Sequence, residues 1–217
     1  MKRVLISLTF ILFMLTSNGQ ILYFGVGKTF SNFKYKDSQA TSLNHLKGYN
    51  QPSYCVGGRY SLFYSPWHVS FDAMYNRYGA KGSDPKLGNY YEWDATYLGT
   101  NLGIDYEFFR PPINYNEQHG LSLFVRVTVG ADFLLDGTQN LNNTLTDLNG
   151  VEEFDKPFYF VKGIIGVNYY LSKTYMVFAQ YAEGRSFLIG DYKGKEQLNI
   201  LTHNISLGVA INLFYRK

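Results

Sequence analysis

The 217-residue chain has one cysteine, six prolines and two tryptophans, and outside its first residues it lacks long apolar runs. A single cysteine excludes a disulfide framework and any metal site built from a cysteine cluster. The lack of an 18-residue apolar run argues against membrane-spanning helices in the mature protein. Aromatic residues are abundant instead, with 20 Tyr and 17 Phe, and disordered chains have few aromatics.

The first 20 residues show the three parts of a secretory signal. Lys2-Arg3 is a positive n-region, and residues 4–15 form an apolar segment too short to span a bilayer. Ser17 and Gly19 place small residues before a cleavage site at Gln20. We expect residues 1–19 to be a cleaved signal peptide and residues 20–217 to form one domain; the alternative is a short N-terminal core segment. With no Cys near the junction, a lipoprotein anchor is excluded.

The charge is nearly balanced once this segment is set aside. Removing Lys2 and Arg3 from the 20 basic residues leaves 18, against 17 acidic residues, a net charge of +1. This balance predicts no general affinity for nucleic acid or for anionic surfaces.

Beyond Gln20, apolar and small or polar residues alternate with a period of two, which is typical of strands. We expect eight strands, at about residues 21–31, 53–64, 68–78, 94–109, 121–135, 158–171, 175–187 and 199–215. The connections alternate in length as well, because long polar segments follow every odd strand and shorter ones follow the even strands. The pattern predicts an all-β fold, an eight-stranded antiparallel up-and-down transmembrane β-barrel with short periplasmic turns and long extracellular loops.

The alternation leaves two assignments of the faces open. In a soluble lipocalin-like barrel the apolar face lines a ligand cavity, whereas in an outer-membrane barrel it meets lipid. The lipid assignment is favoured by aromatic residues near strand ends and by a second face rich in Gly, Ala and Ser. That second face also has few charges, of both signs. The aromatic residues at strand ends are Tyr54, Tyr64, Tyr75, Tyr106, Phe108, Tyr169, Tyr175 and Tyr215.

Seven charged residues fall on the predicted inner face: Arg59, Asp72, Asp105, Glu107, Arg126, Asp132 and Lys162. Eight strands leave an interior that side chains can fill, and an unpaired buried charge is costly. We therefore expect a structural charge network and a plugged lumen. The alternative is a narrow ion or proton path through the network.

Two segments resemble a known family. The sequence AMYNRYGAKG at 73–82 is similar to a strand that ends in an aromatic-polar pair followed by Gly-Ala-Lys, and YLGTNLGIDY at 97–106 resembles a Tyr-Leu-x-x-Pro-Leu strand motif. Both resemble the PorT-like outer-membrane protein β-barrel domain, often labelled "porin family". The chain departs from the pattern at Asn101, where Pro is usual, and at 184–189. The resemblance implies fold and location, but no functional residue.

The search for chemistry predicts no catalytic, cofactor or metal site. His203 and Ser206 lie three residues apart, so they point to opposite faces of a strand and cannot form a nucleophile–base pair. Asp105 and Glu107 share a face, and we expect them to pair with Arg126 or Lys162. Cys55 is expected to fill the core. The carboxylates of the long loops lack a fixed ligand spacing.

We therefore expect a monomeric barrel in the outer membrane of a Gram-negative bacterium, surrounded by outer-membrane lipid. Its role is predicted to be membrane-structural, or to reside in loops that mediate adhesion or bind another envelope protein. Tyr90, Tyr91 and Trp93 offer an amphipathic contact surface, or alternatively part of the aromatic belt. The competing functions are a lipid-modifying or proteolytic barrel enzyme, a small diffusion channel, and a soluble ligand binder.

Overall fold

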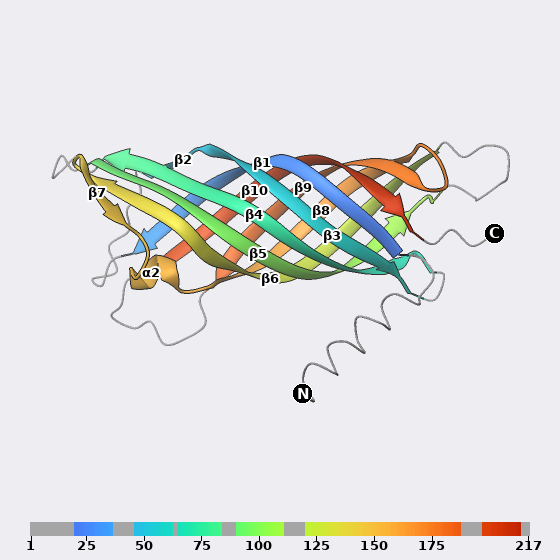
Figure 1. The fold of residues 1–217 in the computed structure, drawn as a ribbon, viewed down its shortest axis with the longest axis horizontal. Coiled ribbons are helices and arrows are strands. Elements are labelled where there is room, and N and C mark those ends of the chain that lie inside the picture. Colours follow the sequence, from blue (N-terminus) through green and yellow to red (C-terminus); the bar gives the residue numbers. More distant parts are fainter. Residues whose placement is uncertain are drawn as a thin grey trace, which may run out of the picture.

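The computed structural model describes residues 20–36, 46–62, 65–83, 90–110, 120–187 and 197–213. Eight long antiparallel strands each pair with the next along the chain, and β1 pairs with β10 to close the ring (Figure 1). These strands are β1 (Gln20–Lys36), β3 (Asn50–Ser61), β4 (Trp67–Ser83), β5 (Tyr90–Phe108), β6 (Gly120–Leu141), β8 (Phe158–Tyr170), β9 (Tyr175–Phe187) and β10 (Gln197–Asn212). Shorter elements are β2 (Lys47–Gly48), β7 (Thr144–Asp147) and the helix α2 (Glu152–Asp155).

The eight predicted strands and the up-and-down barrel are confirmed. Several strands extend further at the end with the long connections: β4 continues to Ser83 and β6 to Leu141. The prediction of a loop from Asp136 onwards was wrong, because β6 continues and turns back into β7. Asn142 and Asn143 have φ of 52° and 69°, as a tight type I′ hairpin requires.

The strands are strongly staggered. Following paired neighbours once around the barrel from Phe30 leads back to β1 at Gln20, ten residues away. Such a stagger makes the strands tilt against the barrel axis, typically by about 35–45°. It therefore decides which inward side chains meet across the lumen.

The outer wall is apolar, which settles the assignment of the faces. Val127 is 61% exposed and Leu207 is 60% exposed, and both point away from the lumen. In a soluble barrel the same residues would line the cavity, so that alternative is wrong. A transmembrane barrel places this face against lipid, where it needs no other cover.

Aromatic side chains surround the end with the short turns, which is the periplasmic end. Trp67 and Tyr106 contact each other with ring centroids 4.8 Å apart, and Tyr106 contacts Phe108 at 4.6 Å. Tyr169 and Tyr175 are exposed at the same end. The predicted belt residues Tyr64 and Tyr215 lie outside the described residues. In the described part of the chain no helix has the length and apolar character needed to cross a membrane.

Candidate functional site: the closed lumen

One carboxylate organises the middle of the lumen. Oδ2 of Asp105 on β5 lies 2.8 Å from Nε of Arg59 on β3 and 2.8 Å from Nη2 of Arg126 on β6. Oδ1 of the same carboxylate accepts a hydrogen bond of 2.7 Å from Ser70. Both guanidinium groups also lie over the ring of Phe124, at 4.7 and 5.5 Å from its centroid. The two buried cations thus share one buried anion and one aromatic face.

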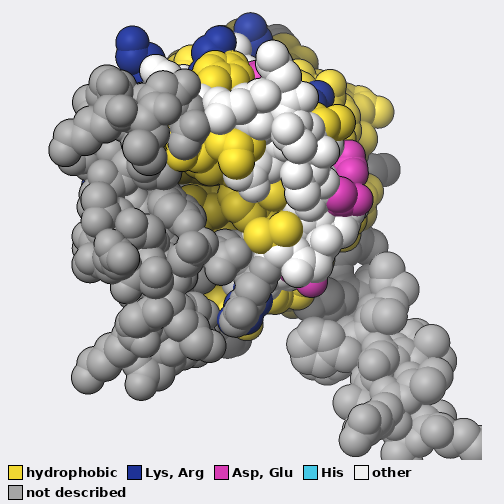
Figure 2. All heavy atoms as spheres, turned by 90° about the vertical axis from the view of Figure 1, so that its left-hand side faces the viewer, with side chains coloured by type: hydrophobic (Ala, Val, Ile, Leu, Met, Phe, Trp, Pro, Cys, Tyr) yellow, Lys and Arg dark blue, Asp and Glu magenta, His cyan; other side chains and the backbone are white. Residues whose placement is uncertain are grey.

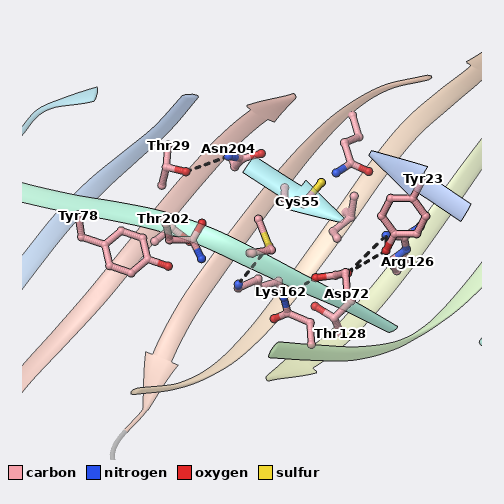
Figure 3. A pocket seen from close by; sticks show the side chains of 16 residues that line it. Tyr23, Thr29, Cys55, Asp72, Tyr78, Arg126, Thr128, Lys162, Thr202 and Asn204 are labelled. Carbon is pink, nitrogen blue, oxygen red and sulfur yellow. Dashed lines mark hydrogen bonds and ion pairs between the residues drawn. The ribbon is translucent and has the colours of Figure 1, made fainter. Parts of the chain in front are cut away.

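Asp72 binds the other side of Arg126 (Figure 3). Its carboxylate accepts hydrogen bonds from the Tyr23 hydroxyl at 2.9 Å and from the Asn101 amide at 2.6 Å. Nη1 of Arg126 donates to the Tyr23 oxygen at 3.2 Å. Asn101 stands where the PorT-like pattern has Pro, and its amide provides a donor to Asp72 that proline lacks.

Glu107 lies nearer the periplasmic end and pairs differently from the prediction. Its carboxylate accepts hydrogen bonds from Ser122, Asn168 and Tyr170, and Nε of Arg110 lies 4.0 Å away. The expected pairing of Glu107 with Arg126 or Lys162 is therefore wrong. The register places Glu107 opposite Phe124. Arg126, two residues further along β6, is instead opposite Asp105.

His68, the first residue of the predicted strand 68–78, is a lumen residue. It is completely buried, and its Nε2 lies 4.0 Å from Glu107. The signal was available, because His68 shares the inward parity of Ser70 and Asp72 on β4.

Asp132 and Lys162 form the part of the charge network that lies nearer the extracellular end. Asp132 accepts hydrogen bonds from Asn76 and from the Tyr78 hydroxyl, and Nζ of Lys162 lies 3.9 Å from its Oδ1. Nζ of Lys162 also contacts the sulfur of Met74 at 3.8 Å. The structure thus places all seven predicted charges in the lumen, each near an opposite charge or a hydrogen-bond donor.

The space left among these side chains is small. A cavity of about 30 Å³ lies between Asp72, Thr128 and Lys162 (Figure 3). A water molecule needs roughly 10–15 Å³ of such space, so the cavity has room for about two or three waters. Among the described side chains, this cavity leaves room for only a few water molecules.

An apolar cap closes the extracellular end. We use this name for the buried cluster Phe33, Tyr78, Ala80, Trp93, Ala95, Tyr97, Leu148, Phe154, Phe158, Phe160, Leu198 and Ile200. Leu148 and Phe154 come from the segment after β7, which folds back into the barrel mouth, and they are 0% and 4% exposed. Figure 2 looks onto this end and shows hydrophobic side chains near its centre, beside white atoms of other side chains and the backbone.

The cap corrects the prediction of a contact surface at residues 90–93. Trp93 is only 5% exposed and contacts Phe154 and Phe33 inside the cap. Tyr91 is half-buried against it, and of the three only Tyr90 is exposed. Alternation along β5 turns Trp93 inward, and the folded-back segment then covers it.

Tyr49 lies at the extracellular rim of the barrel and contacts both Trp93 and Lys81. Its hydroxyl donates to the carbonyl oxygen of Trp93 at 3.3 Å, and Nζ of Lys81 lies 5.9 Å from its ring centroid. Burial raises the pKa of the Tyr49 phenol to about 12, so the ring is neutral at pH 7.

The described residues offer little for catalysis. On the outer wall Nδ1 of His203 lies 2.7 Å from the Tyr181 hydroxyl, while Ser206 is buried on the opposite face of β10. Cys55 is buried in the lumen. In this part of the chain, no three His, Cys, Asp or Glu residues lie close enough together to hold a metal ion.

The sequence matches no protein-family profile and no curated protein. Several solved structures are similar to the chain. The outer membrane protein OprG from Pseudomonas aeruginosa has a TM-score of 0.55 at 12% identity, with 91% of this chain and 97% of that chain covered. Neisserial surface protein A has a TM-score of 0.48 at 12% identity, covering 88% and 97%. The attachment invasion locus protein Ail of Yersinia pestis has a TM-score of 0.41 at 14% identity, covering 89% and 99%.

The likeness to OprG supports the fold of a small outer-membrane β-barrel. At 12% identity it carries no residue roles to this chain. Membership of the PorT-like family stays a prediction.

Proposed function

We propose that this protein is an exported outer-membrane barrel with a closed lumen, acting through its extracellular end to bind another envelope protein. The observation that carries the proposal is the double closure of the barrel. The charged side chains fill the middle, and Leu148 and Phe154 close the mouth. A channel function needs a continuous aqueous path, whereas a binding function needs only the rigid rim.

The most suitable contact surface is the tip of the β6–β7 hairpin together with Tyr90. Leu145 is 69% exposed, and Tyr90 and Leu141 are each 37% exposed. The backbone N–H of Tyr90 donates to Oδ1 of Asn142 at 2.7 Å, and the N–H of Asn142 donates to the carbonyl oxygen of Tyr90 at 3.1 Å. Exposed apolar side chains on an ordered hairpin favour protein contact, because little entropy is lost on binding.

Export and membrane location rest on separate observations. Residues 1–19 have the pattern of a signal peptide, and the outer wall is apolar around the barrel. The resemblance to PorT-like barrels supports the same location. Intact-mass measurement of the protein from outer-membrane fractions tests this part. The expected mass is that of a chain beginning at Gln20, and a mass that includes Met1 would contradict cleavage.

The binding role is tested by placing a photo-crosslinking amino acid at Leu145 in living cells of the native bacterium. We expect a discrete crosslinked product with another envelope protein. The matched control places the same amino acid at Lys173, in the periplasmic turn between β8 and β9, and should not give that product. Identical products from both positions, or none from Leu145, would count against the proposed surface.

A further inference from the structure

Two opposite charges lie in the outer wall, one on each side of β10. Lys28 on β1 and Glu183 on β9 have exposed side chains that point away from the lumen. Strands β1 and β9 pair with the two edges of β10 (Figure 1). Between the two charges, β10 presents the outward side chains of His203 and Ile205. Ionisable residues in contact with lipid are costly, so this pair calls for a partner.

The stagger of the strands places the two charges at the same depth. Glu183 pairs with His203 in the sheet, and His203 pairs with Phe30 on β1. One circuit of paired neighbours that starts in this direction from Phe30 descends ten residues in eight steps. The two steps from Phe30 to Glu183 therefore descend by about two and a half residues. The outward residue of β1 that is level with Glu183 is thus Lys28.

Both charges lie within the apolar band of the wall. Glu183 is eight residues along β9 from Tyr175, which belongs to the periplasmic aromatic belt. This separation is about 20 Å along the axis at the usual strand tilt, and the apolar band of such barrels is about 25 Å tall. Near the same depth the other long strands present exposed uncharged side chains, namely Val161, Val129, Leu102, Tyr75 and Tyr54.

The neighbours on the same barrel do not form an ion pair with either charge in the described part of the chain. His203 is opposite Glu183, but its Nδ1 lies 2.7 Å from the Tyr181 hydroxyl and its ring stacks on the Tyr181 ring. Arg185 follows Glu183 on the same face, nearer the extracellular end, and no nitrogen of Arg185 or His203 lies within 4.0 Å of the Glu183 carboxylate. Lys28 lies across the width of β10 from Glu183, about 10–12 Å away.

Opposite charges at equal depth on the two sides of one strand are complementary to themselves. A two-fold axis along the membrane normal keeps the depth of each residue and exchanges the two sides. A second copy that faces β10 about such an axis therefore brings its Lys28 to Glu183 of the first copy, and its Glu183 to Lys28. The exposed side chain of Ile205 lies beside the axis and meets its own counterpart.

We propose that a second copy of this chain docks against β10 within the membrane, with two reciprocal ion pairs between Glu183 and Lys28. A lipid amine or a cation of another membrane protein would match Glu183 but leave Lys28 without a partner, whereas a second copy matches both. The sequence led us to expect a monomer, because alternation along a strand does not determine the depth of a charge. This inference rests on the proposed membrane location, but not on binding at the β6–β7 hairpin.

The test exchanges the charges in the mature chain, refolded in vesicles of neutral phosphatidylcholine. Association is measured by energy transfer between chains labelled at Lys173→Cys, over a range of protein-to-lipid ratios. Glu183→Lys and Lys28→Glu should each weaken association at least about tenfold, because each then places like charges together twice. The double variant Lys28→Glu/Glu183→Lys restores both pairs and should associate within about threefold of the original chain. Heat-dependent gel migration verifies that each variant folds.

Disulfide formation locates the interface independently. Ile205→Cys should form a crosslinked dimer under mild oxidation, whereas Leu102→Cys, at similar depth on the opposite wall, should not. A monomeric original chain, a double variant that associates no better than the single ones, or equal crosslinking from both cysteines would overturn the proposal.

If the exchanged variants do not fold, Glu183→Gln takes their place and should weaken association about tenfold. Its control is Arg185→Gln, which removes the neighbouring cation and should leave association within about threefold of the original chain. Equal loss in the two variants would overturn the pairing. Since the purified chain meets no other protein in these vesicles, none of these results bears on the crosslinking from Leu145.

Discussion

Nη2 of Arg126 lies 2.8 Å from Oδ2 of Asp105, and both side chains are almost completely buried in the barrel. The same oxygen lies 2.8 Å from Nε of Arg59. One carboxylate therefore pairs with two guanidinium groups from different strands, while Asp72 lies 4.0 Å from Nη1 of Arg126. Because β3, β5 and β6 meet at this point, Asp105 connects three walls of the lumen.

Replacing Asp105 by Asn should destabilise the barrel by about 3–5 kcal/mol, because two buried cations lose their shared anion. The measurement is urea unfolding of the refolded protein in lipid vesicles, followed by the loss of the heat-modifiable band. Asp136→Asn removes a carboxylate at the exposed rim and should change the free energy of unfolding by less than about 0.5 kcal/mol. A loss below about 1 kcal/mol for Asp105→Asn would contradict the network as described.

Val127→Arg tests the lipid-facing wall. Val127 lies mid-strand on β6 with 61% of its surface exposed, so the variant places a charge in the hydrocarbon. We expect a cost of about 2–4 kcal/mol, measured as above, and poor insertion into preformed vesicles. Val127→Leu at the same position should insert normally. Normal insertion of the Arg variant would mean that this face does not meet lipid.

Cys55 reports directly on access to the lumen. Its side chain borders the small cavity and is 6% exposed. A membrane-impermeant maleimide should leave the folded barrel unmodified and label it fully in urea, because a closed lumen excludes the reagent. Labelling of the folded barrel at the rate seen in urea would reveal an open path from one side.

Leu148→Ala should release the segment that closes the mouth. The side chain is fully buried in the cap, and truncating a buried Leu costs about 2–5 kcal/mol. Since this cost falls on local docking, proteolysis between residues 142 and 157 should quicken about tenfold or more while the barrel band persists. Leu145→Ala lies in the same segment but is 69% exposed, and it serves as the control. Equal rates for the two variants would show that Leu148 does not hold the segment in place.

Alternation was sufficient to predict the barrel, because a transmembrane strand must expose one face and bury the other along its whole length. It assigned Val127 to the outer wall and Arg126 to the lumen, as the structure shows. The lengths of the connections then decided the topology. Alternation within a strand and the lengths of the connections are both local in the sequence. Neither requires knowing which strands pair in the barrel.

Pairing across the lumen depends on the stagger, which alternation does not determine. This is why Glu107 was assigned to Arg126 or Lys162, although it binds Ser122, Asn168 and Tyr170. The cap was missed for a different reason. A polar, irregular segment after β7 gave no sign that Leu148 would fold back over Trp93.

The most direct test of the closed barrel is the conductance of the refolded mature chain in a planar bilayer of neutral lipid. The filled lumen and the apolar cap predict no current steps above the background of the bilayer at 1 M KCl. The orientation and number of inserted barrels are verified by protease cleavage of the extracellular segment. Reproducible current steps from verified barrels would contradict the closed lumen and would make a diffusion channel the better function.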